Sequence, residues 1–328
     1  MEHYIPPFDL TNEMLELSAE IMENLGRLSN INELEKLPRL RKVSRVKSIH
    51  SSLAIENNTL SYEQVTDIID GKKVLGPQDD IIAVKNAFSA YKELDKIDPY
   101  KIEDLLKIHG MMMNGLVERA GSIRSGEVGV IDGNGKVIHA APPVSMARGL
   151  LEQLFDWVKS ADVQMLIRSS VFHYEFEFIH PFSDGNGRMG RLWQTALLAS
   201  WKPIFKYIPI ESVIKDNQQE YYNAFKISTS EGKSNAFILF MLNVINQAIK
   251  DIVSDSREHY NHLNIQINKL MRVMETYPQS AQQIMDRLNM KSRVSFRKNY
   301  LLPALEAGLI GMTVPEKPTS KNQMYFKI

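Results

Sequence analysis

The stretch from His180 to Arg191 reads His-Pro-Phe-Ser-Asp-Gly-Asn-Gly-Arg-Met-Gly-Arg and lies between two apolar helix candidates. It contains an imidazole, a carboxylate, three glycines and two guanidinium groups within twelve residues. Glycines let backbone N–H groups converge on an anion, and a helix N-terminus adds a favourable dipole. Arginine suits phosphate oxygens, and a carboxylate beside them suits a bridging Mg²⁺. These residue types predict a triphosphate site with a titratable base at its edge.

The simpler alternative is a loop and helix start whose glycines only turn the chain. The same Asp-Gly-Asn-Gly also occurs at 132–135, where Val128, Val130 and Val137 flank it and predict a β-hairpin. The tetrapeptide is therefore informative at 184–187 only because a His-Pro precedes it and two arginines follow. It is not a P-loop, since no Gly-Lys-Ser/Thr follows the glycines.

The composition excludes few functions. The 39 basic and 39 acidic residues cancel, so net charge steers the protein to no partner, and the absence of cysteine excludes disulfides and thiolate zinc sites. Residues 1–9 lack the basic-then-apolar pattern of a signal peptide, and we expect no membrane-spanning run. These features favour a soluble cytoplasmic protein without a membrane partner.

Hydrophobic spacing predicts a mainly α-helical chain. Thr11 begins one helix, residues 39–57 form a second that stops at Asn57-Asn58, and Ser61 to Gln64 is a capping box for a third. Further helices are expected around 81–91, 105–112, 150–158, 163–179, 192–201 and 237–244. A polar region, 254–262, then leads into a connecting helix.

The last fifty residues predict a separate small domain. Ser280 begins a short helix, a second helix runs from about 292 to 307, and Gly308 ends it. Two strands, 309–314 and 323–328, complete a winged-helix pattern. From Lys291 onward there are seven basic and two acidic residues, a local charge of +5 (7 − 2), which suits DNA phosphates or simply a solvated protein-binding domain.

At every fixed position, residues 180–191 match the signature His-Pro-Phe-x-Asp-Gly-Asn-Gly-Arg-x-x-Arg, and the chain from about 35 to 250 resembles the Fic family. The resemblance implies a Fic-fold helical bundle with a β-hairpin flap, followed by a winged-helix domain. It divides the chain into an N-terminal helical region (1–98, with an inhibitory helix at about 39–57), a catalytic core (99–252), a connecting helix (253–278) and the winged helix (279–328). It also implies Mg²⁺-dependent transfer of AMP from ATP to a hydroxyl group of a protein.

The resemblance gives a role to each residue of the motif. His180 would be the general base, and Asp184 would hold Mg²⁺ on the α- and β-phosphates. Arg191 would hold the γ-phosphate. The remaining nucleotide-binding positions would be Gly185, Asn186, Gly187, Arg188, Gly190 and, outside the motif, Tyr222 near the adenine. A family asparagine seven residues beyond Tyr222 is Thr229 here, and Tyr221 and Tyr222 could equally be core aromatics.

Two further patterns allow competing interpretations. His173, Glu177 and His180 follow i, i+4 and i+7 spacing, which suits a metal triad, or else His173 and Glu177 brace the loop. Ser52 and Glu56 share a helix face, and Glu56 is a solvated glutamate in the bland interpretation. The segment nevertheless resembles the family's inhibitory motif, Ser/Thr-x-x-x-Glu-Gly/Asn, which implies that Glu56 pairs with Arg191 and obstructs the γ-phosphate site.

The family resemblance also suggests partners. It implies that the hairpin at 127–138 is a flap that aligns a segment of the target protein, which presents a Ser, Thr or Tyr hydroxyl, by main-chain pairing. Alternatives that stay open are a DNA-binding regulator with an ATP-sensing core, a transferase that uses UTP, and removal of AMP. The sequence does not decide between a monomer and a homodimer, and the winged helix could contact DNA or protein.

Overall fold

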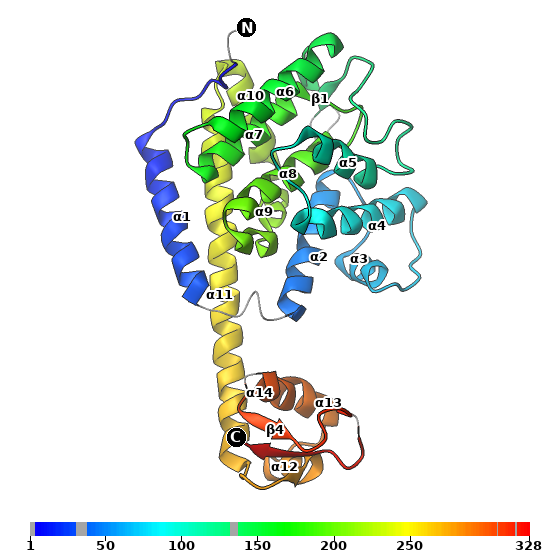
Figure 1. The fold of residues 1–328 in the computed structure, drawn as a ribbon, viewed down its shortest axis with the longest axis vertical. Coiled ribbons are helices and arrows are strands. Elements are labelled where there is room, and N and C mark those ends of the chain that lie inside the picture. Colours follow the sequence, from blue (N-terminus) through cyan, green and yellow to red (C-terminus); the bar gives the residue numbers. More distant parts are fainter. Residues whose placement is uncertain (1–3, 31–37, 132–136, 307, 319) are drawn as a thin grey trace. The chain divides into compact units, whose positions relative to one another are not determined.

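The computed structural model describes residues 4–30, 38–131, 137–306, 308–318 and 320–328, and these are mostly helical, as the sequence predicts (Figure 1). The chain divides into two compact units, Met1–Ile252 and Val253–Ile328. The helices of the first unit are α1 (Asn12–Asn30), α2 (Pro38–Ile55), α3 (Tyr62–Ile69), α4 (Gln78–Lys92), α5 (Ile102–Met112), α6 (Val144–Ser160), α7 (Met165–Ile179), α8 (Asn186–Trp201), α9 (Ile210–Asp216), α10 (Gln218–Glu231) and the first part of α11 (Asn235–Val273), with short 3₁₀ turns at Glu93–Asp95 and Pro203–Tyr207.

Several predicted helix ends are confirmed. The Thr11 hydroxyl accepts a hydrogen bond from the Met14 N–H at 3.3 Å, and Ser61 with Gln64 forms the capping box of α3. Asn57 is left-handed, with φ 64°, and follows the last turn of α2. The helix that follows Thr11, α1, ends at Asn30. Local side-chain capping therefore sets these N-termini, as the sequence indicates.

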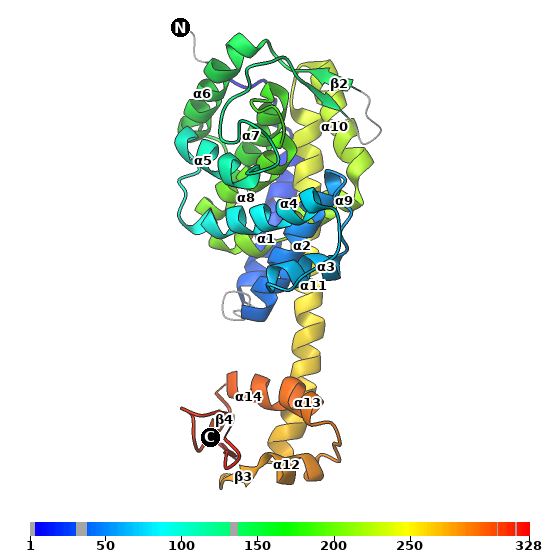
Figure 2. The ribbon, with the colours of Figure 1, turned by 90° about the vertical axis from the view of Figure 1, so that its right-hand side faces the viewer.

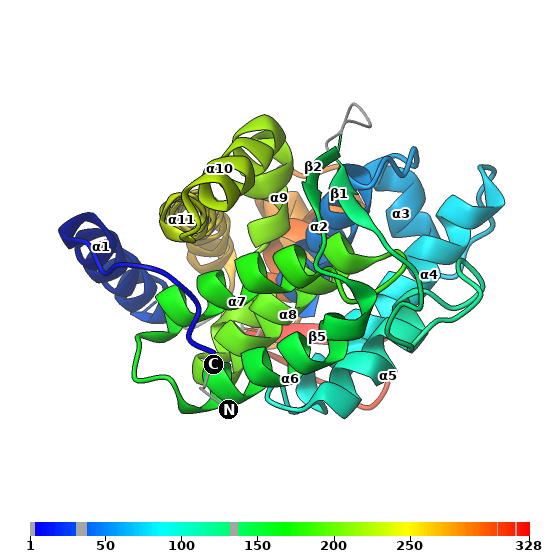
Figure 3. The same cartoon turned by 90° about the horizontal axis from the view of Figure 1, so that it is seen from above.

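The centre of the first unit is formed by α7 and α8, which lie side by side (Figure 3). Every residue of α7 from Leu166 to Ile179 is buried except Arg168 and Phe178. A helix that is buried on all sides belongs in the core. Pro181 then prevents the helix from continuing, and the chain turns through residues 180–185 into α8. This turn between two buried helices positions the site.

The helix α2 and a β-hairpin of the first unit also reach this turn. Figure 2 shows α2, α3 and α4 packed together, and α2 also contacts α8 and α9. The strands β1 (Gly129–Ile131) and β2 (Val137–Ala140) pair antiparallel, with Val130 opposite His139 and a bulge after Val130. The predicted hairpin is therefore present, while its Asp-Gly-Asn-Gly turn at 132–135 falls outside the described residues.

The helix α11 corrects two expectations. It is one helix from Asn235 to Val273, whereas the sequence suggested a polar region before a separate connecting helix. Residues 254–262 contain no glycine or proline, so nothing in them ends a helix. The segment Asn235–Ser254 is also long and apolar enough to cross a membrane by length and composition, and 61% of that window is buried inside the structure. The core helix of a soluble protein gives the same pattern, so this is weak evidence for a membrane span.

The second unit has its own core. It contains α12 (Ala281–Arg287), a helical stretch made of α13 (Arg293–Phe296), a π-turn (Arg297–Leu301) and α14 (Leu302–Glu306), and the strands β3 (Gln279–Ser280), β4 (Ile310–Met312) and β5 (Met324–Lys327). The sheet order is β3-β5-β4, so the expected two-stranded ribbon has a third, two-residue strand. Ser280 forms a capping box, and Leu270, Ile284 and Phe296 are buried together.

Candidate active site

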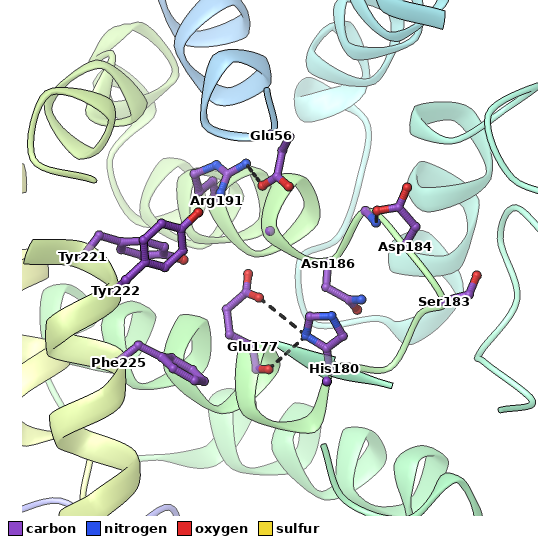
Figure 4. Close-up of a pocket in the computed structure, with 13 residues that line it drawn as sticks. Glu56, Glu177, His180, Ser183, Asp184, Asn186, Arg191, Tyr221, Tyr222 and Phe225 are labelled. Atoms are coloured by element: carbon purple, nitrogen blue, oxygen red, sulfur yellow. Dashed lines mark hydrogen bonds and ion pairs between the residues drawn. The ribbon is translucent and has the colours of Figure 1, made fainter. Parts of the chain in front are cut away.

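The turn between α7 and α8 opens into a cavity of about 220 Å³ (Figure 4). Four segments that are distant in the sequence contribute to it: the end of α2, the strand β1, the α7–α8 turn and α10. The lining residues are Glu56, Gly129, Glu177, His180, Ser183, Asp184, Gly185, Asn186, Gly187, Arg191, Tyr221, Tyr222 and Phe225. The structure thus brings most of the predicted site residues together.

His180 is held in a defined tautomer. Its backbone is left-handed, with φ 51° and ψ 59°, and its Nδ1 lies 3.2 Å from the Glu177 carbonyl oxygen. A carbonyl can only accept, so Nδ1 carries the proton and Nε2 keeps a free lone pair. Burial lowers the pKa of His180 to about 4. The side chain is therefore a neutral imidazole that can accept a proton at Nε2.

Beyond His180, backbone geometry prepares an anion site at the start of α8. Asn186 closes the turn, because its side chain accepts from the Phe182 N–H and donates to the Phe182 carbonyl, both at 2.9 Å. Gly185 is left-handed, with φ 83°, and a Cβ there would collide with the Met113 side chain. Glycine is required at this position for both reasons. The N-terminus of α8 consequently faces the cavity with its helix dipole.

Arg191 is the buried cation of the site. Its side chain is 1% exposed, and its Nε donates to the Ser52 hydroxyl at 3.1 Å. One terminal nitrogen donates to the Ser52 carbonyl at 3.0 Å and to Glu56 Oε1 at 2.7 Å. Glu56 directly follows α2, so the residue at the end of this helix is the carboxylate partner of the guanidinium (Figure 4). Burial is the largest single influence and lowers the pKa of Arg191, but the charge and hydrogen bond of Glu56 together with the charges of Tyr221 and Glu177 outweigh it, so the pKa is raised.

Asp184 and Arg188 form an ion pair at the start of α8. The Asp184 side chain is 58% exposed, and both its oxygens are 3.1 Å from one terminal nitrogen of Arg188. Among the described residues, no group of three His, Cys, Asp or Glu side chains could hold a metal by itself. Mg²⁺ usually takes one or two carboxylates together with substrate phosphates and water. The exposed Asp184 beside the anion site fits that mode.

Two of the predicted nucleotide-binding residues do not line the cavity, and neither does the predicted inhibitory residue Ser52. Arg188 is turned toward Asp184, and its Nε is buried without a partner. Gly190 faces α7, where a Cβ would lie 2.5 Å from Glu177 Oε1 and 2.9 Å from the His173 ring. Gly190 therefore permits close packing of α7 against α8. Neither residue contacts the space where a nucleotide could enter in this conformation.

The metal-triad alternative does not fit the hydrogen bonds of His173. Its Nδ1 lies 2.6 Å from Gln194 Oε1, and its Nε2 lies 3.2 Å from the Tyr221 hydroxyl. Both ring nitrogens are thus engaged within the protein. Glu177 Oε1 is buried without a hydrogen-bond partner, and burial raises the pKa of this carboxyl to about 8. Glu177 lies beneath His180 and lines the cavity, which its sequence position alone did not indicate.

Aromatic residues of α10 form another wall. Tyr222 lines the cavity as predicted, and Tyr221 and Phe225 do so as well. Thr229 bonds to the Phe225 carbonyl and lies 3.3 Å from the Tyr174 hydroxyl, away from the cavity. Supporting residues outside the wall include His109, whose Nε2 donates to the Asp184 carbonyl while its Nδ1 accepts from the Gly121 N–H. No sequence pattern marked this histidine.

Comparison with known proteins identifies the family. The Fic/DOC family profile matches residues 99–198, and the profile "Filamentation induced by cAMP protein Fic-like, C-terminal domain" matches residues 265–326. A Fic family protein from Desulfovibrio desulfuricans G20, known from a crystal structure, is 42% identical, with a TM-score of 0.76 and coverage of 99% of this chain and 98% of that one. The chain is thus a helical protein whose sequence motif at residues 180–191 forms an anion site. It belongs to the Fic family.

Curated relatives share a shorter region. "Protein adenylyltransferase Fic" of Nematostella vectensis is 26% identical over 207 residues, covering 59% of this chain and 45% of that protein. The protein of the same name from Drosophila erecta is 30% identical over 209 residues, covering 59% and 39%. The chain therefore spans less than half the length of these two relatives.

Proposed function

We propose that this protein transfers AMP from ATP to a Ser, Thr or Tyr hydroxyl of a protein, with Mg²⁺, and that Glu56 inhibits the transfer. One observation carries the proposal: the buried guanidinium of Arg191 faces an anion site beside His180 and is occupied by Glu56 at 2.7 Å. A buried arginine needs an anionic partner, and a γ-phosphate is the substrate group that matches its geometry. The names of the curated relatives agree with this activity.

In the proposed reaction, each step has a residue that can perform it. The target hydroxyl oxygen attacks the α-phosphorus, the bond to the bridging oxygen of the β-phosphate breaks, and pyrophosphate leaves. The hydroxyl proton goes to Nε2 of His180, whose Nδ1 is fixed by the Glu177 carbonyl. The backbone of Gly185 to Gly187 at the start of α8 stabilises the phosphate charge. Asp184 would hold Mg²⁺, which when bound neutralises phosphate charge.

The inhibited state is supported by size as well as charge. The cavity holds about 220 Å³ while Glu56 lies in it, whereas small-molecule sites usually measure roughly 300–1,000 Å³. Removing the Glu56 side chain would free Arg191 and enlarge the cavity in one step. We therefore expect Glu56→Gly to raise AMP transfer, measured with labelled ATP and total protein as acceptor.

The controls separate this mechanism from general effects. The same Glu→Gly change at the exposed Glu63 of α3 removes a carboxylate outside the cavity and should leave the rate unchanged. Glu56→Gly combined with His180→Ala should transfer nothing. Mass spectrometry of the automodified Glu56→Gly protein distinguishes AMP from UMP as the transferred group. Equal rates for Glu56→Gly and wild type would refute the inhibitory role of Glu56.

A second function, DNA binding, is favoured by the surface of the second unit. Lys291, Arg293, Arg297 and Lys298 are exposed, and no ion pair involves them among the described residues. Arg293 of α13 and Arg297 of the following π-turn both act on Tyr325 of β5, because their charges lower its pKa against the larger raising effect of burial. Cations without internal partners are suited to a polyanion such as duplex DNA.

A gel shift of the full chain with duplex DNA tests this function. Binding should weaken as the salt concentration rises. In the double variant Arg293→Ala with Arg297→Ala, the slope of log K against log salt concentration should become smaller in magnitude by about 1.8, since each phosphate contact contributes about 0.9. The matched control is Arg148→Ala with Lys159→Ala on α6, which should leave binding unchanged, as should His180→Ala. Binding that is absent at low salt would exclude DNA as a partner.

A further inference from the structure

Arg124, between α5 and β1, is buried next to the site and has no role in the reaction described above. Its side chain is fully buried. Its backbone N–H donates to the Pro181 carbonyl at 2.9 Å, and its Nε donates to the His180 carbonyl at 2.9 Å. Its two terminal nitrogens donate to the carbonyls of Gly126, at 2.9 Å, and Pro142. Four donors of one residue therefore reach four backbone carbonyls.

These carbonyls belong to two structures that meet at the cavity. His180 and Pro181 begin the α7–α8 turn, whereas Gly126 precedes β1 and Pro142 follows β2. One guanidinium thus joins the two ends of the hairpin to each other and to the turn that carries the base. A second link agrees with this arrangement, because the His139 Nε2 of β2 donates to the Phe178 carbonyl of α7 at 3.0 Å.

His180 needs such support because its conformation is unfavourable. It is one of three described non-glycine residues with positive φ, and the other two, Asn57 and Asn289, are asparagines, which adopt the left-handed conformation more readily. Strained backbone persists only where the surroundings fix it. The carbonyls of His180 and Pro181 are held by Arg124, and the left-handed turn in turn places Nδ1 at the Glu177 carbonyl.

We propose that Arg124 is a positioning residue that holds His180 in its left-handed conformation and fixes the base relative to the hairpin. The catalytic part of this inference rests on the proposed AMP transfer. Arginine is required because a planar fork can reach carbonyls in three directions, whereas the ammonium of lysine keeps the charge without that geometry. Arg124→Lys keeps a positive charge at this position. It leaves the other groups that act on His180 in place, namely Glu177, Glu56 and His139.

The first test is spectroscopic and does not depend on activity. ¹⁵N NMR of the histidine rings, assigned with a His180→Gln sample, should show His180 as the Nδ1–H tautomer in the full-length protein. In Arg124→Lys the Nδ1–H signal should fall by at least twofold in favour of the Nε2–H tautomer. Arg148→Lys, the same change on the surface of α6, should leave the spectrum unchanged.

The second test measures catalysis in the Glu56→Gly background. Adding Arg124→Lys should lower kcat about 100-fold, because small misplacements of a catalytic group cost rates of this order, while the Kd for ATP stays within twofold. A purely structural role would instead weaken ATP binding together with kcat. If the lysine variant does not fold, Arg124→Gln, which keeps two N–H donors, replaces it, and failure of both variants to fold would overturn the proposal.

The outcomes separate the two claims. If Glu56→Gly transfers no AMP, the proposed function is wrong, and the tautomer measurement still decides the role of Arg124. If Arg124→Lys keeps the Nδ1–H tautomer, or if its kcat stays within twofold of the Glu56→Gly parent, Arg124 is not the residue that positions the base.

Discussion

At the scale of single residues, burial sets the charge of the cavity. His180 and Glu177 are both shifted toward their neutral forms, because burial lowers the pKa of the imidazole to about 4 and raises that of the carboxyl to about 8. At neutral pH the base and the residue beneath it therefore carry no charge. Arg191 remains as a buried cation nearby, with Glu56 as its anionic partner. An incoming phosphate would replace Glu56 as that partner.

The low pKa of His180 predicts an unusual pH profile for the Glu56→Gly variant. Because the folded pKa lies below the ordinary value of 6.5, the base stays deprotonated and active as the pH falls through 6, and its activity is lost only as the pH approaches 4. The ratio kcat/KM reports the pKa values of the free enzyme. We expect less than a twofold loss between pH 7.5 and 6.0, whereas a histidine with an ordinary pKa would lose about fourfold. A fourfold loss would show that His180 is not the shielded base.

Sequence and structure agree on those residues whose role depends on local spacing. The motif places His180, Gly185 and Gly187 correctly at the cavity, since a turn of a few residues fixes them relative to one another. Arg124 could not be predicted, because its role depends on carbonyls that lie 56 and 18 residues away in the chain. Backbone carbonyls are present in every residue, so no sequence pattern marks which ones a distant side chain will reach.

At the scale of secondary-structure elements, more than Glu56 holds the end of α2 at the cavity. Ser48, two turns earlier, donates from its hydroxyl to the buried carboxylate of Glu211 on α9 at 2.7 Å. Tyr91 of α4 donates to the other oxygen of Glu211 at 2.8 Å, and the Thr195 hydroxyl of α8 is 3.4 Å from that oxygen. Glu211 thus connects α2 to the helix that carries Arg191. Without this contact the end of α2 would be less firmly placed at the cavity.

We therefore predict that Ser48→Ala partly relieves inhibition. It removes one buried hydrogen bond and leaves a Glu211 oxygen with one partner fewer, which costs about 1 kcal/mol in the inhibited state. A cost of that size raises the active population about fivefold, less than the effect of Glu56→Gly. The measurement is AMP transfer by the otherwise wild-type chain. Ser44→Ala, one turn earlier in α2, is the control, and an unchanged rate in both variants would mean that Glu211 does not hold the inhibitory helix.

Helix length was predicted less well than helix identity. The sequence correctly located most helix starts, because caps such as Ser61 and Ser280 act within four residues. The continuity of α11 is not evident from the sequence because a polar stretch resembles a loop, although only glycine, proline or a cap ends a helix reliably. The sequence also missed β3, a two-residue strand whose pairing with β5 depends on residues 44 and 46 positions later. Such pairings are decided by tertiary structure.

At the scale of the whole molecule, the two units have separate hydrophobic cores. The core of the second unit is formed by its own residues, among them Leu270, Ile284, Phe296 and Tyr325. All the described residues that line the cavity belong to the first unit. Stability of the second unit and catalysis by the first are therefore expected to be separable.

Ile284→Ala tests this separation. Ile284 is completely buried in the second unit, and truncation of a buried isoleucine to alanine costs about 2–5 kcal/mol. In hydrogen exchange measured by mass spectrometry, the variant should lose protection in peptides from 281 to 306 and keep it in peptides from 165 to 201. Added to the Glu56→Gly variant, the same substitution should leave AMP transfer within twofold, because none of the described residues of the second unit lines the cavity.

The matched substitution is Ile108→Ala in α5, which is equally buried but lies in the first unit beside His109, the residue that supports the Asp184 carbonyl. It should lower protection of peptides from 165 to 201 and reduce AMP transfer, while peptides from 281 to 306 remain protected. If Ile284→Ala instead removes protection from both sets of peptides, the two cores unfold as one cooperative unit. Because the sets are measured in the same sample, the comparison does not depend on the absolute stability of either variant.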